Sequence, residues 1–247
     1  MNVALFVTCL VDLFRPSVAF AAIRLLERHG CTVSVPAAQT CCGQPGYNGG
    51  DRASAQALAR QVIASCEGYE HIVVPSGSCG GMLRHHYPAL LADDPVWAER
   101  ARAFAAKAHE LIAFLTGVLG VRAVEGSYAG TIAYHDSCSS LREIGIREEP
   151  RALLRSVRGL ALAAVAGGET CCGFGGAFCV KYPAISVEMA RRKTAAITAS
   201  GADTLLAGDL GCLLHLAGRL KREGSRIRVR HVAEVLAGND APPIGEA

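Results

Sequence analysis

Short apolar runs alternate with longer stretches of helical spacing along most of the chain. The runs predict strands at residues 2–8, 32–36, 71–75, 131–135, 160–165 and 203–207. Apolar positions three and four residues apart predict helices at residues 17–29, 51–65, 96–116, 148–157, 183–200, 210–222 and 231–236. Strands that alternate with helices are typical of α/β proteins whose sheets are mostly parallel.

The cysteines indicate that this order of elements occurs twice. One cysteine follows the first strand of each half, a Cys-Cys-Gly turn comes later, and a further cysteine ends the series. These positions are Cys9 and Cys138, Cys41–Cys42 and Cys171–Cys172, and Cys79 and Cys212. We therefore predict an internal duplication, with one cysteine-rich repeat at residues 1–124 and a second at residues 125–247. Because ligands in open α/β sheets gather beyond the carboxyl ends of the strands, we expect the cysteine sites there, one per βαβ-type half.

Composition and charge restrict the class of protein. The chain has 247 residues, 51% of them apolar and 19% charged, which suffices for a sizeable buried core. Its net charge of +3 forms no basic stripe, which argues against nucleic-acid binding. No apolar run approaches the about 18 residues of a membrane span, and no signal peptide is recognisable. We expect a soluble cytoplasmic protein, where eleven cysteines are more typical of metal or redox chemistry than of disulfides.

The adjacent cysteines point to a site with more than one metal ion. Neighbouring side chains on a strand face opposite ways, so two adjacent thiolates reach one site only from an irregular turn. Gly43 and Gly173 permit that turn, and backbone N–H groups there are available to sulfur. Iron–sulfur clusters select thiolate ligands and can use adjacent ones, because their iron atoms lie side by side. Structural zinc is the alternative, although the usual pair of Cys-x-x-Cys motifs is absent.

The other three cysteines have no counterpart in the opposite half. We interpret Cys31, in a β-like run, and Cys66, near the end of a helix, as buried apolar residues. Cys179 follows the second Cys-Cys-Gly closely, and its role stays open.

Three further residues are candidates for a catalytic role. His135 precedes Cys138 and is either a general base or a cap at the strand end. Arg142 and Lys181 lie near the cysteines in sequence, where each either binds a carboxylate or faces solvent.

The cysteine spacing carries a family resemblance. Cys-x31-Cys-Cys-x36-Cys in the first half and Cys-x32-Cys-Cys-x39-Cys in the second, each with glycine directly after the cysteine pair, resemble the cysteine-rich CCG domain. That domain occurs in heterodisulfide reductase B, in the anaerobic glycerol-3-phosphate dehydrogenase C protein and in the iron–sulfur component of glycolate oxidase. The stretches CCGFGG, VKYP and YHDSC, with the chain length and the lack of a ferredoxin module, resemble the short lactate-utilisation protein A family, also called YkgE. The resemblance covers essentially the whole chain.

The resemblance implies an iron–sulfur oxidoreductase subunit that takes part in the oxidation of L-lactate to pyruvate. The implied cofactors are one or two iron–sulfur clusters of the 4Fe-4S type, held by the eight repeated cysteines and relaying electrons. The implied partners are lactate-utilisation proteins of the B and C types and an electron-acceptor protein or quinone. The alternatives are a CCG subunit that acts on glycolate, glycerol-3-phosphate or a disulfide, and a structural subunit that holds zinc.

One element departs from the full CCG pattern. In heterodisulfide reductase B the last element is Cys-x-x-Cys, and each five-cysteine motif contributes to a pair of non-cubane clusters. Here the first position of that element is Ser76 in one half and Asp209 in the other. Three interpretations stay open: an oxygen ligand in place of a thiolate, an ordinary four-iron cluster, or the loss of one cluster.

Overall fold

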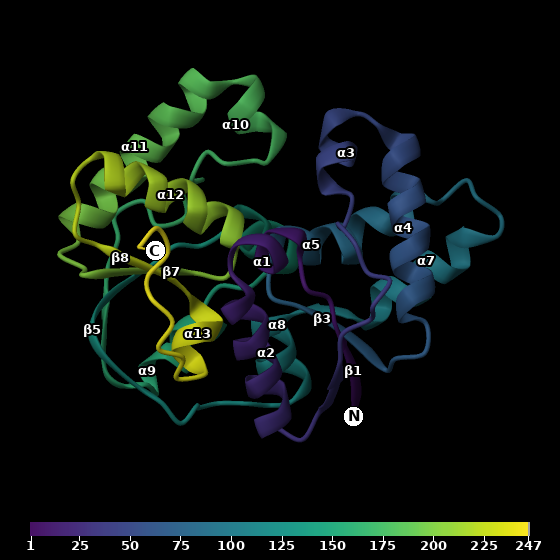
Figure 1. Cartoon of the computed structure of the whole chain (residues 1–247), viewed down its shortest axis with the longest axis horizontal. Helices are drawn as coiled ribbons and strands as arrows, with labels where there is room; N and C mark the ends of the chain where they lie inside the picture. Colours follow the sequence, from purple (N-terminus) through teal and green to yellow (C-terminus); the bar gives the residue numbers. More distant parts are fainter. Residues whose placement is uncertain (247) are drawn as a thin grey trace.

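Two parallel sheets with the same strand order form the framework of the protein (Figure 1). The structure, a computed structural model, describes residues 1–246. The first sheet has the order β2 (Thr32–Ser34), β1 (Asn2–Leu5), β3 (His71–Val74) and β4 (Ala108–Glu110). The second has the order β6 (Arg158–Ala163), β5 (Ser127–Tyr134), β7 (Thr204–Ala207) and β8 (Arg228–His231). All neighbouring strands are parallel, so the predicted α/β duplication is confirmed.

Helices connect the strands of each half. The first half contains α1 (Cys9–Phe14), α2 (Pro16–Arg28), α3 (Gln44–Gly49), α4 (Arg52–Cys66), α5 (Gly77–Gly81), the π-helical turn η1 (Met82–His86), α6 (Tyr87–Leu90), α7 (Trp97–Lys107), α8 (Leu111–Ala113) and the π-helical turn η2 (Phe114–Val118). The second contains the π-helical turn η3 (Ser140–Ile144), α9 (Glu149–Arg155), α10 (Ala177–Lys181), α11 (Pro183–Ala199), α12 (Leu210–Arg222) and α13 (Val232–Leu236). None of the helices in residues 1–246 has the length and apolar character that crossing a membrane requires.

The single long helix predicted at residues 96–116 is wrong. The chain leaves the helical conformation after α7, forms β4, and becomes helical again in α8. The sequence of β4, Ala-His-Glu, contains no β-branched residue and has little strand propensity of its own. Pairing with β3, in the register Ile72↔Ala108, supplies the hydrogen-bond partners that the local pattern does not reveal. The edge strand β8, which pairs with β7, is likewise absent from the sequence-based expectation.

The register of the two sheets shows which residues are equivalent. Just beyond β1, the N–H of Phe6 donates to the carbonyl of Val73 at 2.8 Å. Just beyond β5, the N–H of His135 donates to the carbonyl of Leu206, also at 2.8 Å. Phe6 and His135 therefore occupy the same position in the two halves, each three residues before a repeated cysteine.

The two halves meet at the carboxyl ends of β3 and β7. The Ser76 hydroxyl donates to the Asp209 carboxylate at 3.2 Å, and the Ser78 N–H donates to the same oxygen at 2.9 Å. A Cβ atom added at Gly77 would overlap Ser140 of the other half, so glycine is required for this close approach. Because Ser76 and Asp209 are equivalent residues, the halves are related by an approximate two-fold axis near this contact.

A second polar contact between the halves lies beside their shared apolar core. Buried residues of β1 and α2 pack in one cluster with residues of β5 and β7. Next to this core, Arg15 forms a two-pronged ion pair with Glu234 of α13, at 2.9 and 3.2 Å. The Ser17 hydroxyl also donates to Glu234, at 2.6 Å, and the Glu234 side chain is fully buried. The boundary at residues 124 and 125 stays a prediction.

Candidate metal centres

The first set of cysteines converges at the carboxyl ends of β1 and β3. Cys9 begins α1, Cys41 and Cys42 precede α3, and Cys79 lies in α5. The Cys9 thiol donates to the Cys41 sulfur at 3.9 Å, and the Cys42 thiol donates to the Cys79 sulfur at 3.3 Å. Cys41 is also in hydrogen-bonding reach of Cys42, so the four sulfurs form one group of cysteines without disulfide bonds.

The first Cys-Cys-Gly turn presents one sulfur as a thiolate. Gly43 has the left-handed φ of +81°, as expected, and its N–H donates to the Cys41 sulfur at 3.4 Å. The buried Tyr87 hydroxyl donates to the carbonyl of Cys42 at 2.9 Å and holds the turn from the other side. Hydrogen bonds with Cys42 and Cys9 lower the pKa of the Cys41 thiol to about 2. The thiolate is the form of cysteine that binds metal.

The second set converges in the same way. Cys138 follows β5, Cys171 and Cys172 precede α10, and Cys212 lies in the first turn of α12. The Cys172 thiol donates to the Cys212 sulfur at 3.1 Å. Cys171 is in hydrogen-bonding reach of both Cys138 and Cys172, which connects all four sulfurs.

The second turn repeats the chemistry of the first. Gly173 has a φ of +88°, and its N–H donates to the Cys171 sulfur at 3.4 Å. The N–H of Phe174 donates to the Cys172 sulfur at the same distance, 3.4 Å. Hydrogen bonds with Cys138 and Cys172 lower the pKa of the Cys171 thiol to about 2. The first half therefore combines one thiolate with one backbone N–H directed at sulfur, and the second half combines one thiolate with two.

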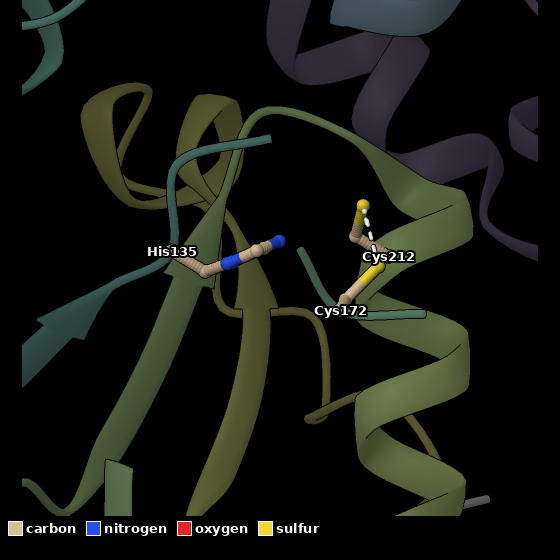
Figure 2. A group of neighbouring side chains, drawn as sticks. All are labelled: His135, Cys172 and Cys212. Carbon is tan, nitrogen blue, oxygen red and sulfur yellow. Dashed lines mark hydrogen bonds between the residues drawn. The ribbon is translucent and has the colours of Figure 1, made fainter. Parts of the chain in front are cut away.

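His135 is directed from the end of β5 toward Cys172 and Cys212 (Figure 2). One of its ring nitrogens and the two sulfurs lie within 4.8 Å of one another. The side chain is 1% exposed, and neither ring nitrogen has a hydrogen-bond partner among residues 1–246. Burial, together with the positive charge of Lys193, lowers the pKa of the imidazole to about 3, so the ring is neutral at ordinary pH. Its suggested role as a general base stays a prediction.

Arg142 and Lys181 lie on the surface. Arg142 belongs to η3 and Lys181 ends α10, and both are exposed. Neither side chain forms a hydrogen bond or ion pair within the described part of the chain, so their carboxylate-binding role stays a prediction.

The unrepeated cysteines stand apart from both groups. Cys31 is 7% exposed and Cys66 is fully buried, each within an apolar cluster, as their interpretation as core residues requires. Cys179 is half-buried in α10, and its thiol donates to the carbonyl of Gly176 at 3.1 Å.

Ser76 and Asp209 act as helix caps. The Ser76 hydroxyl accepts the N–H of Cys79 at 3.5 Å at the start of α5. Asp209 accepts the N–H of Gly211 at 3.1 Å at the start of α12, while its other oxygen accepts the two hydrogen bonds from the first half. Both side chains are therefore engaged in capping and in joining the halves.

A cavity of about 140 Å³ lies against the first set of cysteines. Cys9, Cys41 and Cys79 line one side, and Phe174 and Gly211 of the second half line the other. The second half thus supplies part of the wall around the first set. None of the residues that line this cavity is a lysine, arginine or histidine.

One buried charged residue near the second set was not predicted from the sequence. Lys193 of α11 is 1% exposed, and its ammonium group donates to the carbonyl of Gly168. Burial is the main cause that lowers the pKa of Lys193, while the nearby Asp136 opposes it. The only signal in the sequence was a lysine on the otherwise buried face of the helix predicted at 183–200.

Known proteins share both the repeat and the overall sequence. The cysteine-rich CCG domain matches residues 3–84 and again residues 132–217. Proteins called lactate utilization protein A from Bacillus cytotoxicus and Halalkalibacterium halodurans are each 46% identical over 236 residues, covering 96% of this chain and 98% and 96% of their own lengths. The crystal structure of a hypothetical protein from Helicobacter pylori has a similar fold, with a TM-score of 0.68 and 14% identity, over 97% of this chain and 49% of that one. The chain therefore belongs to the lactate utilization protein A family and carries the CCG domain twice.

Proposed function

We propose that this chain is an iron–sulfur subunit of a multi-subunit enzyme that oxidises L-lactate to pyruvate. The names of its relatives connect them with lactate utilization. The observation that carries the proposal is the convergence of eight cysteine sulfurs in two groups of four, with sulfur–sulfur distances of 3.1, 3.3 and 3.9 Å. Oxidation of lactate releases two electrons, and this subunit relays them onward.

The residues fit iron–sulfur clusters by their donor chemistry. One cluster would be held by Cys9, Cys41, Cys42 and Cys79, and the other by Cys138, Cys171, Cys172 and Cys212. Clusters bound there would accept and release single electrons. The backbone N–H groups of the two turns donate to ligand sulfurs, as in protein sites that tune the reduction potential of a cluster.

The surroundings of the cysteines support electron relay rather than lactate binding on this chain. A lactate carboxylate is best bound by a charge-assisted hydrogen bond from arginine or lysine. The cavity beside the first set lacks such a residue, and Lys193 near the second set is buried and donates to the carbonyl of Gly168. The exposed Arg142 and Lys181 form no hydrogen bond or ion pair with either set within the described residues. We therefore place lactate oxidation on partner proteins of the B and C types, with an acceptor protein or quinone receiving the electrons.

Zinc is the second candidate. The 3.9 Å between the Cys9 and Cys41 sulfurs is close to the edge of a tetrahedral zinc site, which is about 3.8 Å for zinc–sulfur bonds of about 2.3 Å. A chain holding zinc in both sites would be structural and could not relay electrons.

Metal analysis of protein produced without oxygen separates the two candidates. A brown protein that contains iron and acid-labile sulfide in equal amounts supports the proposal. A colourless protein with zinc and no sulfide would replace it with the structural role.

Single cysteine variants then test the two-site arrangement. Cys42→Ala and Cys172→Ala should each lower the iron content by about half, because each removes a ligand from one group only. Cys66→Ala is the matched control, since it removes a buried thiol outside both groups, and its iron content should be that of the unaltered protein. If either ligand variant lost all its iron, the halves would share one site.

A further inference from the structure

The environment of the second set of cysteines contains one buried group without a partner. Both ring nitrogens of His135 are buried and lack hydrogen-bond partners among residues 1–246. Leaving a buried polar atom unpaired is destabilising, so such atoms are rare in folded proteins. The ring is nevertheless directed at Cys172 and Cys212, with a nitrogen within 4.8 Å of both sulfurs (Figure 2). A bound metal would supply a partner for the ring nitrogen that faces the two sulfurs.

At the position equivalent to His135, the first half has the apolar residue Phe6. Phe6 makes the same backbone hydrogen bond as His135, and its side chain is fully buried. A histidine that served only to fill this part of the fold would be replaceable by such an apolar ring, which needs no partner.

The helices next to the two Cys-Cys-Gly turns, α4 and α11, also differ at two buried positions, which are apolar in the first half and polar in the second. Gly43 packs against Ala55 of α4, and Gly173 packs against Ser186 of α11. Seven residues further along the same helices, Val62 and Lys193 are both buried. Ala55 and Val62 of the first half are thus apolar, whereas the equivalent residues of the second half, Ser186 and Lys193, carry a hydroxyl and an ammonium group.

We propose that His135 is a nitrogen ligand of the iron–sulfur centre held by the second set of cysteines, whereas the first centre has thiolate ligands only. This inference rests on the proposed function, because it needs iron at the second site. Neutral imidazole is an established ligand of iron, and its nitrogen is the one donor in the second site that the first site lacks. The chain would therefore hold two chemically different centres.

A neutral imidazole ligand gives an iron–sulfur centre a higher reduction potential than a negatively charged thiolate in the same place. The reduction potential of the second centre should therefore depend on which of these two ligands stands at position 135.

Isotope labelling combined with pulsed electron paramagnetic resonance tests the ligand directly. Protein is produced without oxygen in cells supplied with ¹⁵N-histidine and is brought to a paramagnetic state by dithionite. A strongly coupled histidine nitrogen in the unaltered protein, lost in His135→Phe, is the expected result. The variant installs the residue that the first half carries at this position. His215→Gln is the control, because His215 lies in the same half, 3.4 Å from the Ser186 hydroxyl, and should leave the coupling unchanged.

The possible outcomes distinguish this inference from the proposed function. Iron and sulfide present with only weak nitrogen coupling, or with coupling that persists in His135→Phe, would overturn the histidine ligand and leave the iron–sulfur assignment intact. Absence of iron from the unaltered protein would overturn both. A second measurement is the reduction potential of the second centre, which should fall in His135→Cys, where a thiolate replaces the imidazole.

Discussion

Replacing Asp209 by alanine should weaken the protein more than the loss of an ordinary helix cap. The carboxylate of Asp209 accepts the N–H of Gly211 in its own half, and the Ser78 N–H and Ser76 hydroxyl of the other half. The residue is 3% exposed, so water does not readily replace these bonds. The substitution therefore removes the cap of α12 and, at the same time, the hydrogen bonds that connect the two halves.

The size of the effect follows from these bonds. Loss of an aspartate cap costs about 1 kcal/mol. A buried N–H left without an acceptor, here that of Ser78, costs about 1–3 kcal/mol more. The Ser76 hydroxyl contributes less, because it retains the neighbouring Ser78 hydroxyl at 3.3 Å. Asp209→Ala should thus lower the free energy of unfolding by about 2–4 kcal/mol.

Urea unfolding of the metal-free protein, followed by circular dichroism, measures this quantity. Asp51→Ala is the matched control, because Asp51 caps α4 at the surface with a hydrogen bond inside its own half, and the loss of stability should be clearly smaller. A double-mutant cycle with Ser76→Ala isolates the energy of the contact between the halves. Equal losses for Asp209→Ala and Asp51→Ala, or strict additivity with Ser76→Ala, would show that the contact does not stabilise the fold.

Three further variants test other parts of the structure. Arg15→Leu should lower the free energy of unfolding by about 3–5 kcal/mol, because it leaves the buried Glu234 without its cation; Arg102→Leu, at an exposed ion pair, should change it little, and equal effects would contradict this. Burial raises the pKa of Glu110 from 4.5 to about 8, so the folded chain holds a proton that the unfolded chain has already lost, and stability should decrease as the pH rises from 4.5 to about 8. Glu110→Gln should abolish that decrease, as judged by urea midpoints at pH 5 and pH 8; a slope that persists would refute the assignment. Cys31→Ala should leave iron and sulfide content unchanged while lowering the free energy of unfolding by about 1 kcal/mol, and a loss of iron would reassign Cys31 as a ligand.

The strands, cysteine groups and glycine turns that occur in both halves could be predicted from the sequence, because each has a local pattern and the pattern occurs twice. The apolar runs of β1, β3, β5 and β7 are buried strands at the centre of each sheet, where strand character and burial agree. The convergence of distant cysteines followed from one topological rule, that the carboxyl ends of parallel strands meet at one edge. The glycine of each Cys-Cys-Gly could be assigned to a left-handed turn for the same kind of reason.

The remaining features depend on tertiary partners. The edge strands β4 and β8 exist because β3 and β7 offer unpaired backbone groups, and three or four residues carry too little pattern to reveal this. Sequence could place His135 near Cys138, but only the folded second half brings it to Cys172 and Cys212. The engagement of Ser76 with Asp209 likewise appears only when the halves are placed together.

That last contact bears on how such a chain arose. A residue that touches its own counterpart is the mark of an isologous interface, in which two identical subunits face each other across a two-fold axis. The protein thus has the architecture of a homodimer whose two subunits are covalently joined, here through residues 119–126 between η2 and β5. Identical subunits must carry identical centres. Once they are fused, each copy can change alone, and the different residues at the equivalent positions of Phe6 and His135 are possible only in a fused chain.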